Sequence, residues 1–173
     1  MYVSPVLKEA ALADFEKARA EWESTFAHVP DAALDYLKPG DDYAIGGLQV
    51  HVNGVLLHYH RILEALIAGG FAPIDPLDPP GEGDAVNARA KAGLSADGRR
   101  EALAEMASLH SAVLGAAAGL LGESWSRTAQ VVYGVGEAPY STSAEDIIGW
   151  LSDHYREHVE QCPELVAAWR ETG

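Results

Sequence analysis

Apolar residues recur every three or four positions in four separate stretches of the chain, the spacing of an amphipathic helix. The first stretch predicts a helix from about Leu7 to Val29, closed by Pro30. The second predicts a helix that ends at Gly69 and Gly70, because glycine commonly follows the last turn of a helix. Histidines interrupt the apolar stripe of this second helix. The residues of the stripe are Leu48, His51, Val55, His58, Ile62 and Ala65.

Two more helices are expected in the second half of the chain. The third begins at Ser95 or Asp97, both good N-cap residues, and runs to Gly122. The fourth opens at Ser143, where Asp146 completes an approximate capping box, and Pro163 stops it at about Cys162. A last short helix over residues 163–170 starts with this proline. The stripe of the fourth helix again carries histidines, with Ile147, Leu151, His154 and His158 in order.

The segments between these helices are expected to be loops. From Phe71 to Asp97 the chain has four prolines, which predict a long surface loop. From Trp125 to Thr142 we expect a crossover loop, with a short extended piece at residues 131–133 and no convincing β-hairpin. These elements predict an all-α fold, an antiparallel four-helix bundle with long connecting loops, as a single domain over residues 1–173.

Composition narrows the classes of function. The 173 residues carry a formal charge of −14, the wrong sign for binding a nucleic-acid backbone or an anionic membrane surface. No apolar run approaches the roughly 18 residues that span a bilayer. The single cysteine, Cys162, has no partner for an internal disulfide, and the first residues lack the features of a secretory signal. We therefore expect a cytoplasmic protein that binds a small molecule.

The histidines provide the candidate chemistry. His154 and His158 are four residues apart on the inward stripe of one helix, so both imidazoles can reach the same divalent ion. A third ligand has to come from another helix, and His51 and His58 both lie on the inward stripe of the second one. They are about 10.5 Å apart along the axis, so one ion takes only one of them. His60 points elsewhere on that helix.

The stretch from Ala144 to Gln161, with its His-x-x-x-His, resembles the last helix of the DinB/YfiT-like metalloenzymes. The segment from Ile45 to Asn53 is similar to the second helix of that family, where one early histidine is the third ligand. The resemblance implies a four-helix bundle, often dimeric, in which His51, His154 and His158 bind a divalent metal ion. Nickel and zinc are the first candidates for this ion, and iron and manganese are the others.

The same resemblance implies a thiol-dependent transferase or isomerase that uses a low-molecular-weight thiol. Three neutral histidines leave coordination positions open, and a divalent ion there would activate a thiol or water for transfer to a small electrophile. The alternative from another class is a non-catalytic, stress-associated bundle that binds a metal ion or a small molecule.

For the other polar candidates the sequence favours structural or solvated roles. Glu157 completes an H-x-x-E-H pattern that is typical of inverted zinc proteases, in which the glutamate is the catalytic base. Too few residues follow His158 for such a fold, so a solvated charge is favoured for Glu157, as for Asp153 and Glu160. We expect His110 to be a core histidine and His28 to lie at the end of a helix, where it meets the helix dipole. Cys162 is expected to be a small buried hydrophobic residue.

Overall fold

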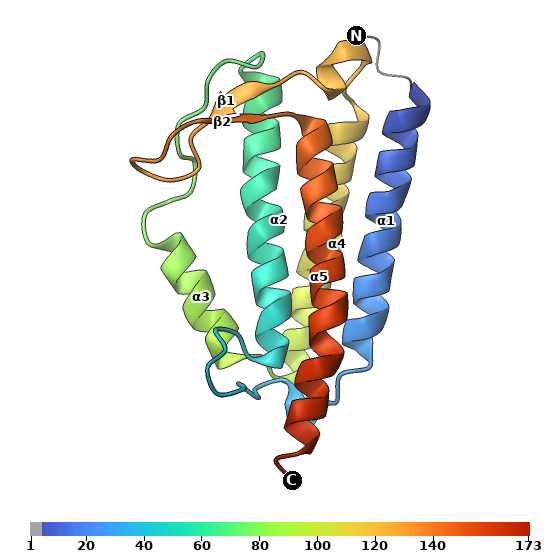
Figure 1. The fold of residues 1–173 in the computed structure, drawn as a ribbon, viewed down its shortest axis with the longest axis vertical. Coiled ribbons are helices and arrows are strands. Elements are labelled where there is room, and N and C mark those ends of the chain that lie inside the picture. The colour runs from blue at the N-terminus through green and yellow to red at the C-terminus, as the bar shows by residue number, and fades with distance from the viewer. Residues whose placement is uncertain (1–4) are drawn as a thin grey trace.

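A computed structural model describes residues 5–173 and shows four long helices side by side (Figure 1). They are α1 (Pro5–Ala27), α2 (Ile45–Ala68), α4 (Ala96–Ala118) and α5 (Ala144–Arg170). Apolar side chains from all four form one buried core, which includes Trp22, Leu48, Met106 and Leu151. The predicted all-α four-helix bundle is confirmed.

The helices do not alternate in direction along the bundle as a simple antiparallel arrangement requires. Helix α1 packs on α5 and α2 packs on α4, and within each of these pairs both helices run the same way (Figure 1). Helices α2 and α5, which are also in contact, run in opposite directions. The reason is the segment between α2 and α4, which returns along the bundle before α4 begins. A long crossover of this kind lets two consecutive helices of a bundle be parallel.

This returning segment is not a loop throughout, because residues Glu82–Ala92 form the helix α3. All four prolines of the segment precede Gly81, and the stretch that follows is rich in alanine. The end of α3 packs tightly on α2: the Ala44 N–H donates to the Ala90 carbonyl at 3.0 Å. A Cβ atom at Gly47 would lie 1.6 Å from that same carbonyl oxygen. Only glycine at this position permits the contact that brings α3 alongside α2.

Helix α5 also departs from expectation, because it continues through Pro163 to Arg170 without a break. Proline removes one backbone hydrogen bond and costs roughly 3 kcal/mol inside a helix. Cys162 and Leu165 on either side are buried against the core, which keeps the helical path favourable. The start of α5 is as predicted: the Asp146 N–H donates to the Ser143 hydroxyl at 3.1 Å, and the Asp146 carboxylate accepts the Ser143 N–H at 2.9 Å.

Between α4 and α5 the chain forms two short antiparallel strands, β1 (Ala129–Val131) and β2 (Tyr140–Thr142). The expected extended piece is thus present in part, but the prediction that no hairpin forms was wrong. Each strand has three residues, too few to give an alternating pattern in the sequence. The backbone of Ile74 extends this pairing through two 2.9 Å hydrogen bonds, to Gln130 and Val132.

Helix α4 is capped by Ser95, whose hydroxyl accepts the Gly98 N–H at 3.0 Å, and it ends at Ala118. Two short 3-10 helices lie in the connections, at Asp31–Ala33 and Gly122–Trp125. Within residues 5–173, none of the helices combines the length and the apolar character that a membrane span requires.

Candidate metal centre

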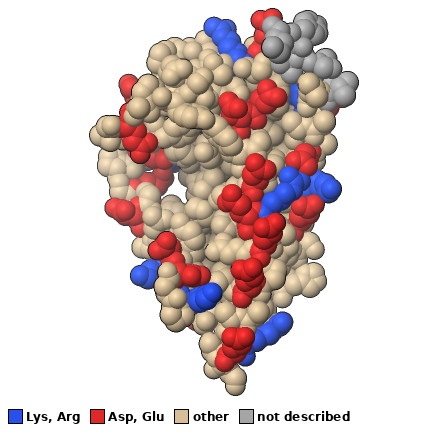
Figure 2. Space-filling view, in the orientation of Figure 1, with Lys and Arg blue, Asp and Glu red and all other residues tan. Residues whose placement is uncertain are grey.

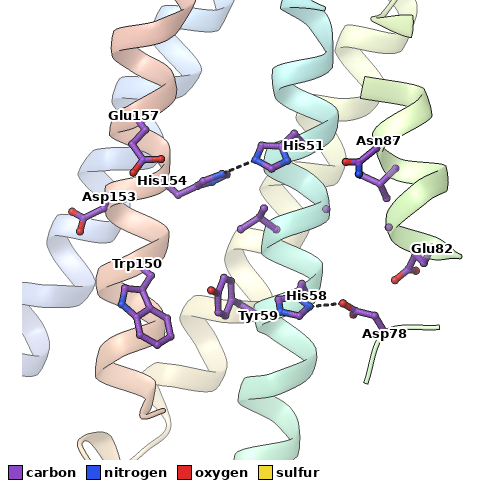
Figure 3. A pocket seen from close by; sticks show the side chains of 14 residues that line it. His51, His58, Tyr59, Asp78, Glu82, Asn87, Trp150, Asp153, His154 and Glu157 are labelled. Atoms are coloured by element: carbon purple, nitrogen blue, oxygen red, sulfur yellow. Dashed lines mark hydrogen bonds and ion pairs between the residues drawn. The ribbon is translucent and has the colours of Figure 1, made fainter. Parts of the chain in front are cut away.

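Three imidazoles from two helices converge where α2 packs against α5. His154 Nε2 on α5 lies 3.0 Å from His51 Nε2 on α2 and 3.1 Å from His158 Nε2. One ring nitrogen from each residue falls within 4.8 Å of the other two. Figure 3 shows the ring of His154 directed from α5 across to His51 on α2. The structure therefore brings together the three histidines that the sequence singled out.

The helices account for this convergence. His154 and His158 are one turn apart on α5, and α2 packs against α5 so that His51 faces them. His158 is the deepest of the three, with 6% of its surface exposed, and the other two are half-buried. The ring of Tyr43 stacks on His51 at 4.6 Å between ring centroids, which restrains its orientation.

Gln161 determines which nitrogen of His158 faces the cluster. The Nδ1–H of His158 donates to the Gln161 side-chain oxygen at 2.8 Å. Neutral imidazole has one N–H, so this bond leaves a lone pair on Nε2, the atom that points to His154. Sequence analysis did not identify Gln161, although its position three residues after His158 places it on the same side of the helix.

Electrostatics keep the cluster neutral and ready to bind a cation. Burial, followed by the charges of His158 and His51, lowers the pKa of His154 to about 3. Burial likewise lowers the pKa of His51 to about 4, and that of His158 is also lowered. At neutral pH all three rings are therefore unprotonated at one nitrogen, as metal coordination requires.

Hydrogen bonds within the protein do not satisfy the three facing nitrogens. With Nε2 of His158 unprotonated, at most one good hydrogen bond can form among them, and one lone pair stays without a donor. Three nitrogens bound to one tetrahedral zinc ion would be about 3.3 Å apart, close to the 3.0 and 3.1 Å found here. The residues present therefore fit a divalent metal ion.

The other histidines lie outside this cluster. His58, the alternative third ligand, bonds through Nδ1 to Asp78 and lies farther along α2 (Figure 3). His60 is 3.3 Å from Glu64 on its own helix, and His28 Nδ1 donates to the Ser24 carbonyl at 2.6 Å. His110 is buried in the core, as expected. Cys162 is also buried, which raises the pKa of its thiol to about 11, so it behaves as a hydrophobic residue.

A cavity of about 570 Å³ opens beside the cluster, between α2, α3 and α5. His51 and His154 line it, whereas His158 lies behind them. Figure 2 shows the molecule hollowed on this side, between α3 and the bundle. The three acids expected to be solvated, Asp153, Glu157 and Glu160, are all exposed. Asp153 and Glu157 line the wall of the cavity, whereas Glu160 lies outside it. The open side of the histidine cluster therefore faces a space large enough for a small molecule.

The comparisons with known proteins agree with this architecture. A model of the DinB superfamily matches residues 14–162, and the chain therefore belongs to that superfamily. Among solved structures, YfiT from Bacillus subtilis superposes with a TM-score of 0.75 at 15% identity, over 96% of this chain and 90% of YfiT. YfiT is described as a probable metal-dependent hydrolase with an unusual four-helix bundle topology. At this identity the likeness establishes the fold. No curated protein matches the sequence.

Proposed function

We propose that this protein is a divalent-metal-dependent enzyme in which His51, His154 and His158 hold the ion and activate a thiol or water for transfer to a small electrophile. The observation that carries this proposal is the position of the cluster in the wall of the cavity. Three protein ligands leave coordination positions open, and here the open side faces the space for a substrate. A structural site would instead be closed by a fourth protein ligand.

The histidines and their neighbours have distinct roles in this proposal. A bound divalent ion supplies a Lewis acid that lowers the pKa of a thiol or water, so that a nucleophile exists near neutral pH. His158, oriented by Gln161, anchors the site from the core, and His51 and His154 present it to the cavity. Glu157 lines the cavity three positions after His154 and is placed to accept a proton if water is the nucleophile.

The choice of metal follows from the donor set. Three imidazole nitrogens suit zinc and nickel first, with iron and manganese as weaker alternatives. The description of YfiT as a probable metal-dependent hydrolase supports water as one nucleophile, and the resemblance stated above supports a low-molecular-weight thiol as the other. A homodimer also remains a prediction.

The experiment that tests the proposal combines metal content with accessibility of the metal. Elemental mass spectrometry of the wild type after dialysis against a weak chelator should find about one divalent ion per chain, and His154→Ala should lose it. In the cobalt-substituted protein, azide or a small thiol should change the visible spectrum, because an exchangeable position is open. A metal ion whose spectrum neither reagent changes would favour the non-catalytic binding protein instead.

A further inference from the structure

The charge of the cavity walls is one-sided. Among the described residues that line it there are four carboxylates and neither lysine nor arginine. Asp153 and Glu157 lie on α5, whereas Asp78 and Glu82 lie on the facing wall formed by α3 and the chain before it (Figure 3). The cavity is therefore flanked by negative charge on two sides.

The two walls differ in how their charge is compensated. Arg61 donates to Asp78 and to Glu82 at 3.0 Å each, and His58 also bonds to Asp78. On this wall one arginine therefore compensates one of the two negative charges. No ion pair of Asp153 or Glu157 is found within residues 5–173. Most of the uncompensated charge is therefore on the α5 wall.

An aromatic surface lies beside this charge. Trp150 lines the cavity three residues before Asp153, and the ring of Tyr59 across the cavity is 5.9 Å from it between centroids. In Figure 3 both rings lie at the end of the cavity away from His51. Aromatic faces attract cations through their ring quadrupole, and a neighbouring carboxylate adds a counter-charge. Both features together select a positively charged group.

The two carboxylates of the α5 wall lie on either side of His154 in the sequence, Asp153 one residue before it and Glu157 three residues after it. In Figure 3 Glu157 lies beside His154, so it adds negative charge next to the histidine cluster. Trp150 lies three residues before Asp153 and is about 6 Å along the helix axis from His154 at 1.5 Å per residue. A cationic group held by Trp150 and Asp153 would therefore leave one helical turn of length for the rest of a small ligand to reach the histidines.

We propose that the substrate of this cavity carries an ammonium group, which packs against Trp150 and pairs with Asp153 while the reacting end faces His51 and His154. The role of the reacting end rests on the function proposed above, whereas the binding of the cation does not. An anionic ligand would meet like charge on the α5 wall without a compensating lysine or arginine.

Three ligands of nearly equal shape test the proposal: choline, its neutral isostere 3,3-dimethylbutan-1-ol, and the anion 3,3-dimethylbutyrate. A quaternary ammonium group cannot coordinate a metal ion, so its affinity reports on the walls alone. Dissociation constants are measured by NMR titration of the full chain, all three ligands on metal-free protein and the first two on zinc-loaded protein as well. We expect choline to bind about tenfold more tightly than the alcohol, and the carboxylate to bind weakest.

Variants of the cavity wall test which residues recognise the ammonium group. Asp153→Asn should reduce the preference for choline to about threefold with the alcohol unchanged, and Trp150→Leu should weaken choline more than Trp150→Phe does. Glu160→Gln, on the same helix and outside the cavity, is the matched control and should leave all affinities unchanged. Equal or tighter binding of the alcohol or the carboxylate, or a preference for choline that Asp153→Asn leaves undiminished, would overturn the inference.

The two proposals fail in different ways. If zinc does not bind but metal-free protein still prefers choline, the proposed metal-dependent function is lost and the cation site stands. If zinc binds to the histidines and choline shows no preference over the alcohol, the cation site is lost and the metal centre stands.

Discussion

Histidines lie at two places beside α5, His110 alone and the cluster of His51, His154 and His158, and their surroundings differ. His110 on α4 is 2% exposed, and both of its nitrogens have protein partners. Its Nε2–H donates to the Glu16 carboxylate, its Nδ1 accepts from the Tyr155 hydroxyl at 3.0 Å, and its ring stacks on Phe15 at 4.0 Å between ring centroids. In the cluster of His51, His154 and His158, nitrogens instead face nitrogens.

The difference shows what separates a structural histidine from a ligand. Burying an imidazole nitrogen without a partner costs about 1–3 kcal/mol, so the core provides one wherever the ring only fills space. At His110 the protein meets this need completely. At the cluster, within residues 5–173, the protein provides an acceptor for Nδ1 of His158, through Gln161, and the facing nitrogens have one another as neighbours. Imidazole nitrogens that all have hydrogen-bond partners indicate a histidine that packs the core. Imidazole nitrogens that converge without such partners indicate a site for a metal ion.

The largest effect is expected on metal affinity. His51→Gln removes the only ligand that α2 contributes, so we expect zinc affinity to fall by more than about 100-fold, which exceeds the usual cost of losing an outer-shell partner. Competition with a chromophoric chelator measures this change. His110→Gln is the matched control and should bind zinc as the wild type does. Equal losses in the two variants would mean that the two groups of histidines do not differ in the proposed way.

The second prediction concerns stability, where His110 should matter more than the histidine cluster. His110→Ala removes two hydrogen bonds and a stacked ring from the core, and leaves the Tyr155 hydroxyl buried without its partner. We expect the free energy of unfolding of the metal-free protein to fall by about 2–4 kcal/mol. Chemical denaturation measures it. His154→Ala, in the half-buried cluster, should cost clearly less in the absence of metal, and a larger cost there would contradict the comparison.

A smaller effect on metal affinity is expected from Gln161. Gln161→Leu removes the acceptor that orients His158, and zinc affinity should fall by about 10- to 100-fold with little change in stability. Gln161→Glu retains an acceptor for the Nδ1–H and should restore the affinity. The chelator competition used for His51→Gln measures both variants. An unchanged affinity in Gln161→Leu would show that the orientation of His158 does not depend on this bond.

The smallest effect is on the pH dependence of stability in the metal-free protein. The folded pKa values of His51 and His154 are lowered to about 4 and about 3, whereas unfolded histidine titrates near 6.5. Between these values the unfolded state binds more protons, so stability falls as the pH falls from 6.5 towards 4. We expect the Tm to decrease by several degrees over this range.

The histidine variants give the control for this pH dependence. His154→Gln has one fewer group to protonate on unfolding, so its Tm should fall less steeply below pH 6.5 than that of the wild type. Thermal melts at matched ionic strength measure both proteins. Parallel curves for wild type and variant would show that titration of the cluster does not contribute.

Periodicity and capping, which act locally along the chain, predicted most of the helices. The spacing of apolar residues placed α1, α2 and α4, and Ser143 with Asp146 placed the start of α5. Local signals failed where distant contacts decided the outcome. Helix α3 forms in a segment that its prolines marked as a loop, because its end packs on Gly47 of α2. Helix α5 continues past Pro163 because the residues on either side are buried.

For the site, the sequence alone determined that His154 and His158 share one face of a helix, because residues four apart on a helix always do. Periodicity left His51 and His58 as equal candidates, since both lie on the same stripe of another helix, and the resemblance to the DinB family was the reason to prefer His51. The tertiary structure shows where each of them lies: the antiparallel packing of α2 on α5 places His51 opposite the pair, and the chain before α3 provides Asp78 as a partner for His58.

The cavity likewise depends on tertiary structure, because its walls come from segments far apart in the sequence. Asp153 and Trp150 are placed on one face by the helix itself, but α2 and α3 enclose the space that they line. Helical periodicity operates over a few residues and is visible in any sequence. The position of one helix against another depends on the sum of many side-chain contacts between distant segments, and for that reason it appears only in the folded chain.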